Sequence, residues 1–162
     1  MAKSKYGKYI IKEPLEKGMA PSLHICAEKG CVGAGLQIPV EVQLLVVNKP
    51  TAFPHPAHSH DGDEIFFIFG GNPQNYYDFD AEIEVHFGEE GEKHIVDSTS
   101  IIYMPKGLVH GPIAITRVNK PFQWMHVLFS SKYNMTEGDI SLHPSHPRQK
   151  YTAAEIKKLK KG

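Results

Sequence analysis

The sequence predicts an all-β protein, built as an antiparallel sandwich or barrel with one short helix near its C-terminal end. Short runs of β-branched and aromatic residues recur along the chain, and turn residues such as Gly, Pro, Asn and Asp separate them. No segment of helical period lies between these runs, as a parallel sheet with crossover helices would require. Short strands at this spacing favour a sandwich or a barrel.

The first part of the chain contains three expected strands. LHICA (23–27) and VEVQLLVVN (40–48) are rich in β-formers, and a group of prolines follows the second run. EIFFIF (64–69) is the third strand, and Gly70 and Gly71 end it. The next segment, NPQNYYDFD (72–80), has the composition of a loop.

The second part adds five more strands and a tight hairpin. AEIEVHF (81–87) alternates apolar and polar residues, as a half-buried strand does, and the acidic turn after it leads into HIV (94–96). His86 and His94 are expected to face each other across this hairpin and to be exposed. The remaining strands are TSIIYM (99–104), IAITRV (113–118) and FQWMHVLF (122–129).

The two ends of the chain differ in character. KYIIK (8–12) is expected to be an edge strand that can pair with another subunit. SLHPSHPRQK (141–150) resembles an extended linker. TAAEIKKLKK (152–161) predicts a helix, because Thr152 and Glu155 form a capping-box pattern and the lysines favour the negative end of the helix dipole. A solvated surface helix is the preferred interpretation, with an anionic docking site as the alternative.

Composition indicates one domain and argues against several classes of partner. The chain has 162 residues, with 18 basic and 18 acidic side chains and only two arginines, Arg117 and Arg148. This balance does not suggest a nucleic-acid or membrane-surface partner. The N-terminus lacks the apolar core of a signal peptide, and no run has the apolar length of a membrane span. We therefore expect a soluble cytoplasmic protein.

Cys26 and Cys31 are too far apart for a CxxC motif and are expected to be reduced thiols outside any site.

Four residues can close around one metal ion. His58, His60 and Glu64 occur in HSHDGDE, and their even numbers place them on one face if the intervening DGD segment keeps the strand register. His110 comes from a later segment, after the turn formed by residues 105–107. Three imidazoles and one carboxylate suit a first-row transition metal, whereas calcium and magnesium prefer oxygen ligands.

The spacing of these residues resembles the two motifs of the cupin superfamily over roughly residues 40–130. The first motif, Gly-x5-His-x-His-x3-Glu-x6-Gly, is matched by the three ligands above and by Gly71. The second, Gly-x5-Pro-x-Gly-x2-His-x3-Asn, is matched by Pro105, Gly107 and His110. Three positions that are not metal ligands in the family depart from the motifs: Ala52, Thr99 and Ala114.

The resemblance implies a double-stranded β-helix (cupin or jelly-roll) barrel with its core at about 40–130. N-terminal strands (8–39) would precede this core, a C-terminal extension (131–162) would follow it, and residues 72–98 would form an added hairpin. The resemblance also implies one bound divalent transition-metal ion, but it does not distinguish among iron, manganese, nickel, zinc and cobalt. Family members with this ligand set include dioxygenases, isomerases, lyases and decarboxylases acting on small organic metabolites. The alternatives are a non-catalytic binding or sensing module and a structural barrel with adventitious metal. A homodimer is the expected assembly.

Other side chains near the motifs are weaker candidates. Phe66 and Ile68 share the parity of Glu64 and are expected to line the cavity. His126 and Tyr103 are the first candidates for an ionisable group beside the metal, with a satisfied core histidine as the alternative for His126. Gln43 is expected to point inward or to be exposed. His55 is considered as a substitute ligand, but its odd number and the flanking prolines argue against it. The DGD segment is expected to be a solvated turn and not a calcium site.

Overall fold

The computed structural model describes residues 6–12, 14–17, 22–26, 38–53, 55–131, 135–137, 140–142, 149–150 and 152–161. Its main strands are β2 (Ser22–Ile25), β3 (Glu41–Val47), β5 (Glu64–Gly70), β6 (Ala81–Phe87), β7 (Glu92–Val96), β8 (Ser100–Met104), β9 (His110–Val118) and β10 (Phe122–Leu128). The shorter strands are β1 (Leu15–Lys17), β4 (Thr51–Ala52), β11 (Met135–Glu137), β12 (Ile140–Leu142) and β13 (Gln149–Lys150). A 3-10 turn, η1 (Gly7–Tyr9), and one helix, α1 (Ala153–Leu159), complete the described elements.

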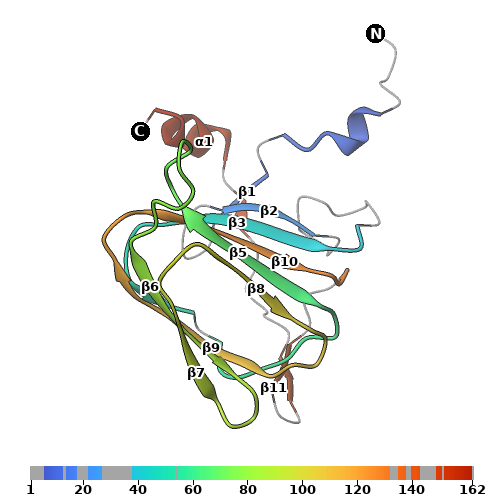
Figure 1. Ribbon diagram of the computed structural model, residues 1–162. Helices are drawn as coiled ribbons and strands as arrows, with labels where there is room; N and C mark the ends of the chain where they lie inside the picture. The colour runs from blue at the N-terminus through green and yellow to red at the C-terminus, as the bar shows by residue number, and fades with distance from the viewer. Residues whose placement is uncertain are drawn as a thin grey trace.

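Apart from β11 and β12, which pair with each other in a separate two-stranded sheet, the described strands form two facing antiparallel layers (Figure 1). One sheet has the order β13-β1-β2-β3-β10-β5-β8, and the other has the order β4-β9-β6-β7. Strand β10 is central to the larger sheet, because all seven of its residues pair with β3 on one side and with β5 on the other. The all-β class and the jelly-roll arrangement of the prediction are confirmed. Within the described residues the two sheets share no strand, so they face each other without closing into one continuous barrel.

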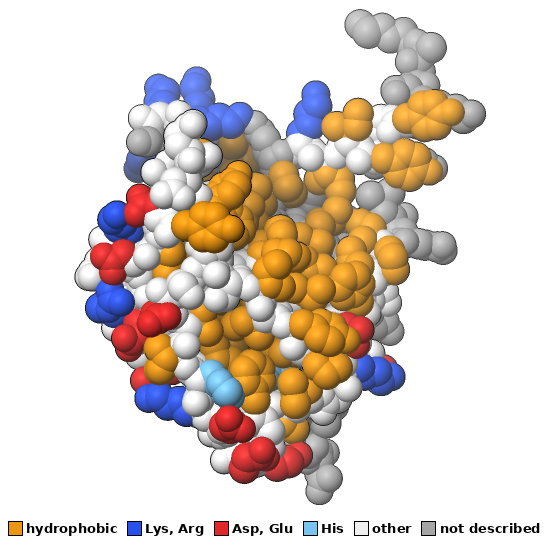
Figure 2. Space-filling view, in the orientation of Figure 1, with side chains coloured by type: hydrophobic (Ala, Val, Ile, Leu, Met, Phe, Trp, Pro, Cys, Tyr) orange, Lys and Arg blue, Asp and Glu red, His pale blue; other side chains and the backbone are white. Residues whose placement is uncertain are grey.

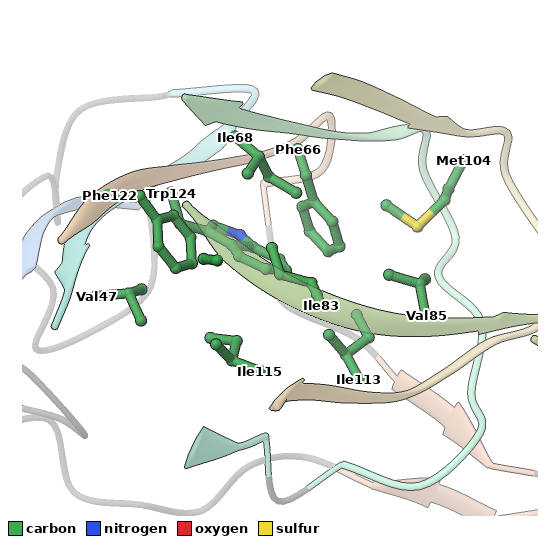
Figure 3. Close-up of a cluster of buried hydrophobic side chains, with 11 residues drawn as sticks. Val47, Phe66, Ile68, Ile83, Val85, Met104, Ile113, Ile115, Phe122 and Trp124 are labelled. Carbon is green, nitrogen blue, oxygen red and sulfur yellow. The ribbon is translucent and has the colours of Figure 1, made fainter. Parts of the chain in front are cut away.

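Side-chain alternation in the two sheets creates the core. In β5 and β10 every second residue is buried, beginning with Glu64 and Phe122. Figure 3 shows side chains from both layers pointing toward one another between the sheets, among them Phe66 and Trp124 from one layer and Ile83 from the other. The expectation that Phe66 and Ile68 share the inner face of Glu64 is confirmed by their burial.

Three local expectations are wrong. Residues 8–12 do not form an edge strand, because Gly7–Tyr9 adopts a 3-10 turn and residues 10–12 have no regular structure. The segment 141–150, expected to be a linker, carries the end of β12 and the whole of β13, and β13 pairs with β1 at the edge of the larger sheet. His86 pairs with Lys93 and not with His94, because the hairpin register is shifted by one residue.

The predicted helix is present and its cap is confirmed. The Thr152 hydroxyl accepts a hydrogen bond from the backbone N–H of Glu155, and the Glu155 carboxylate accepts one from the backbone N–H of Thr152. The helix ends at Leu159, with Lys157 and Lys158 in its last turn. No helix in the described part of the chain is long and apolar enough to cross a membrane.

Candidate metal centre

Two distant segments of the chain meet through their backbones at His58 and His110. The N–H of His58 donates to the carbonyl of His110 at 2.9 Å, and the N–H of His110 donates to the carbonyl of His58 at 2.8 Å. This reciprocal exchange makes the two residues a hydrogen-bonded pair of an antiparallel bridge, whose α-carbons lie about 5.5 Å apart. The separation of the two imidazoles is therefore set by main-chain hydrogen bonds.

A second set of contacts holds the turn before His110 against the segment that carries His60. The N–H of Gly107 donates to the carbonyl of His60 at 3.0 Å, and the N–H of Lys106 donates to the Asp63 carboxylate at 2.9 Å. Gly107 has φ +82°, a left-handed conformation that glycine adopts without steric cost. Asp61 pairs with the side chain of Lys106. The aspartates of the DGD segment thus fasten the two motif turns to each other.

The three imidazoles converge in a buried cluster. His58, His60 and His110 are only 5 %, 5 % and 2 % exposed. Each offers a ring nitrogen, and these nitrogens lie within 4.8 Å of one another. The ring centroids are 4.4 Å apart for His58 and His110, and 4.9 Å apart for His58 and His60. Three nitrogen donors at this spacing can surround one ion.

Backbone carbonyls orient two of the rings. Nδ1 of His58 donates to the carbonyl of Pro56 at 2.7 Å, and Nδ1 of His110 donates to the carbonyl of Leu108 at 3.0 Å. Because a carbonyl can only accept, Nδ1 carries the proton in both rings and Nε2 is the nitrogen left for coordination. Metal-binding histidines are commonly held through their second nitrogen in this way.

Glu64 lies beside the cluster at the start of β5. Its carboxylate oxygens lie 2.9 Å from Nε2 of His110, 3.6 Å from Nε2 of His60 and 2.7 Å from Nε2 of His126. It is 3 % exposed, on the same inner face as Phe66. Burial raises the pKa of Glu64, but the charge of His126 and the hydrogen bonds from His110 and His126 outweigh it, so the pKa lies well below its usual range. The carboxylate is therefore ionised within the site.

Histidine protonation differs across the cluster. Burial and the neighbouring imidazoles together lower the pKa of His58 to about 4, against the hydrogen bond to Pro56 and the charge of Glu64. Burial also lowers the pKa of His110, but its hydrogen bond to Glu64 and the charge of that carboxylate outweigh this and raise it. His58 is thus a neutral donor near neutral pH. Nε2 of His110 lies 2.9 Å from a carboxylate oxygen of Glu64, and any proton that it carries there must leave before this nitrogen can coordinate an ion.

The other predicted candidates divide into inward and outward groups. His126 is buried on the inner face of β10 and touches Glu64. Gln43 is half-buried on β3, where it pairs with His126, and it donates to Ser22. The expectation that Tyr103 lies beside the metal is wrong, because it sits on the outer face of β8, 56 % exposed, and donates to Asp63. His55 is half-buried, and its ring centroid lies 5.9 Å from that of His58.

An apolar wall borders the polar cluster. The ring of Phe66 lies 5.6 Å from that of His126 and 4.8 Å from that of Trp124. Met104, which pairs with Glu64 in the register of β5 and β8, is 1 % exposed. Such surroundings strengthen electrostatic interactions within the cluster because they limit the access of water.

Comparison with known proteins supports the fold and leaves the activity open. No protein-family model matches the sequence, and no curated protein matches it either. A variant of oxalate decarboxylase from Bacillus subtilis is 12% identical over 82% of this chain and 31% of that chain, with a TM-score of 0.50. A cupin superfamily protein from Desulfitobacterium hafniense is 12% identical over 66% of this chain and 75% of its own, with a TM-score of 0.39. An oxalate oxidase is 14% identical over 87% of this chain and 65% of its own, with a TM-score of 0.47.

At these identities the likeness is one of fold. The fold that the cupin resemblance implies is supported by the likeness to the oxalate decarboxylase structure, at a TM-score of 0.50. This chain spans less than a third of the decarboxylase chain it matches. The reactions of these proteins belong to them, and any activity of this chain must be argued from its own residues.

Proposed function

We propose that this chain binds one divalent transition-metal ion through His58, His60, Glu64 and His110, and that it is a metal-dependent enzyme acting on a small organic metabolite. The observation that carries the proposal is the buried cluster of three imidazoles, whose ring nitrogens lie within 4.8 Å of one another. The carbonyl contacts of His58 and His110 occupy Nδ1 of both rings, which supports Nε2 as the coordinating nitrogen in each.

The donor set fits such an ion. Imidazole nitrogens suit zinc, copper, iron and nickel, and a carboxylate completes a set that manganese and cobalt also accept. The Glu64 carboxylate contacts the Nε2 atoms that would coordinate the ion, so coordination would replace these contacts with bonds to a shared cation. Four protein ligands leave up to two positions of an octahedral site for a substrate. A bound ion would supply Lewis-acid chemistry or, as iron or manganese, one-electron chemistry.

The chain's own side chains would orient the reactants and control protons. His126 holds one oxygen of Glu64 at 2.7 Å and so fixes the orientation of that ligand. It is also an ionisable group of the inner face that lies outside the proposed ligand set, which makes it the candidate for proton transfer to a bound metabolite. Phe66 and Trp124 would keep the substrate's surroundings dry.

Metal content tests the ligand assignment. Elemental analysis of tag-free protein is expected to show that His58→Ala combined with His110→Ala removes about one metal ion per chain. The matched control is His86→Ala combined with His94→Ala, two histidines of the β6–β7 hairpin, which should leave the metal content unchanged. A double variant of the cluster that keeps its full metal content would refute the proposal.

A non-catalytic binding or sensing module is the second candidate. The apolar wall beside the cluster supports it, because an inner face bordered by Phe66, Met104 and Trp124 offers few groups for proton transfer. Turnover separates the two candidates. Metal-loaded protein should convert a small organic acid or sugar, and His126→Asn should lower kcat while keeping the metal. Ligand binding to the metal without any turnover would favour the binding module.

The homodimer and the cytoplasmic location remain predictions. The edge strand expected at residues 8–12 is absent, so dimer formation would need another surface. The outer face of the larger sheet exposes Val46, Ile101 and Tyr103 by more than half, and Figure 2 shows hydrophobic side chains gathered over β5 and β8. Size-exclusion chromatography with light scattering is expected to give twice the chain mass, and a monomer mass would overturn the expectation.

A further inference from the structure

A second group of metal-binding side chains lies on the inner face of the larger sheet, outside the proposed centre. Strands β2 and β3 pair so that His24 lies opposite Gln43 and Ile25 opposite Val42. His24 and Cys26 are two residues apart and therefore lie on the same face. Continuing the register places Cys26 opposite Glu41. The topology thus gathers an imidazole, a thiol and a carboxylate at one end of the β2–β3 pair.

The three side chains are close together and buried. Each offers one ligand atom, and these atoms lie within 4.8 Å of one another. His24 is 4 % exposed, Cys26 0 % and Glu41 5 %. Nε2 of His24 lies 2.8 Å from a carboxylate oxygen of Glu41. A carboxylate and an imidazole are seldom fully buried unless they serve a paired or metal-bound arrangement.

The chemistry of this trio suits a divalent ion with an affinity for sulfur. A thiolate, a carboxylate and a neutral imidazole carry two negative charges, which a divalent cation neutralises. Zinc takes the same three ligand types, and a thiolate disfavours magnesium and calcium. Coordination of the thiolate would release the thiol proton, and the two negative charges would then balance the charge of the ion, so that no net charge is left in the buried site.

This trio is separate from the His58 cluster. Glu41 on β3 and Glu64 on β5 both pair with Leu128 on β10, which lies between them and is 0 % exposed. Neighbouring strands are about 4.8 Å apart, so the two glutamates are roughly 10 Å apart at their α-carbons. Gln43 occupies the corresponding position between His24 and His126. The two groups can therefore hold separate ions.

From these observations we propose that His24, Cys26 and Glu41 form a second metal site, selective for zinc or a similar divalent transition metal. The site needs no substrate access, because its residues are buried. A bound ion would tie the start of β3 to the end of β2 beside the principal centre, and because the trio supplies three ligands, water would take the fourth position of a tetrahedral ion.

Cobalt substitution tests the proposal, because of the two proposed ligand sets this one includes a cysteine and the His58 set does not. Protein stripped of metal with a chelator is titrated with Co²⁺, and thiolate coordination is expected to produce a sulfur-to-cobalt charge-transfer band in the near ultraviolet. Cys26→Ser should abolish the band. Cys31→Ser, the matched control at the other cysteine of the chain, should keep it. A wild-type protein without the band, or a band that survives Cys26→Ser, would overturn the proposal and leave the trio a buried ion pair.

A conservative variant covers the case in which Cys26→Ser fails to fold. Glu41→Gln keeps the size of the side chain and its hydrogen bond to His24, while it removes the charge. The Co²⁺ affinity, measured from the growth of the sulfur-to-cobalt band, should fall by more than about tenfold. Replacing a residue that only contacts a ligand already costs about that much, so loss of a ligand's charge should cost at least as much. Unchanged affinity would count against the site. His58→Ala combined with His110→Ala should leave the band intact, so failure of the principal centre and failure of this site give different results.

Discussion

Acid should destabilise the metal-free protein through His58. Its imidazole has an ordinary pKa of 6.5 and a pKa of about 4 in the folded protein, because burial and the neighbouring imidazoles oppose its charge. Between these two values the unfolded chain binds a proton that the folded site does not accept. Unfolding therefore becomes more favourable as the pH falls, and the stability that His58 contributes is present above 6.5 and is lost toward pH 4.

The size of the effect follows from the shift. A shift of one pKa unit corresponds to about 1.36 kcal/mol, so the full difference amounts to roughly 3 kcal/mol. More than half of this loss of unfolding free energy, roughly 2 kcal/mol, occurs between about pH 7 and pH 5, where unfolding is readily measured. His110 contributes with the opposite sign, because its raised pKa stabilises the fold below its ordinary value. A comparison of variants is needed to isolate the His58 contribution.

Urea unfolding of chelator-treated protein measures the effect. The unfolding free energy of the wild type and of His58→Gln is determined at several pH values between about 7 and 5. The wild type is expected to lose roughly 2 kcal/mol more than the variant over this range. His94→Gln, at an exposed position on β7, should follow the wild type. Equal pH dependence in the wild type and in His58→Gln would refute the argument from burial.

Three further substitutions test the support of the site and the fold. Gly111→Ala should weaken metal binding and lower the free energy of unfolding by about 1–2 kcal/mol. Gly111 has φ +89°, and an added Cβ would lie 3.0 Å from the Pro56 carbonyl oxygen that holds Nδ1 of His58. Metal titration and thermal unfolding measure the two effects. Ile83→Ala should lower the free energy of unfolding by about 2–5 kcal/mol, because this core side chain is 0 % exposed. The control Ile95→Ala, on the exposed face of β7, should change it by no more than about 0.5 kcal/mol in the same urea unfolding experiment. Thr152→Ala should lower the helical circular-dichroism signal of α1 and cost about 1 kcal/mol, and an unchanged signal would show that the capping box is not needed.

Alternation was the most informative property of the sequence. The strand 81–87 has the bounds that its polar and apolar residues predict, and the inward face of β5 follows from the parity of Glu64, Phe66 and Ile68. The same reasoning brings His58, His60 and Glu64 together, because the DGD turn returns the chain to the inner face. These features depend on neighbours in the sequence and on the period of a strand, and both are visible without coordinates.

Features that depend on pairing between distant segments were not predictable in this way. Tyr103 has the polar group expected of a proton donor, but its direction depends on the register of β8 with β5, which places it outside. The grouping of His24 with Cys26 had a signal, since HIC repeats the alternate spacing of HSH. Its third member, Glu41, joins only through the register of β2 with β3. The strand expected at 8–12 had β propensity but no partner among the described strands, and propensity alone does not make a strand.

The reciprocal bonds between the main chains of His58 and His110 have a consequence for how the protein handles its metal. Their spacing is maintained by hydrogen bonds that need no ion, so an incoming metal would meet ligands already in position and little ordering would accompany its capture. Loss of the ion would then leave the backbone framework standing, ready to accept another. The metal ion that occupies the centre in the cell would therefore be decided by the availability of each ion and by its relative affinity. Folding around one particular cation would matter less.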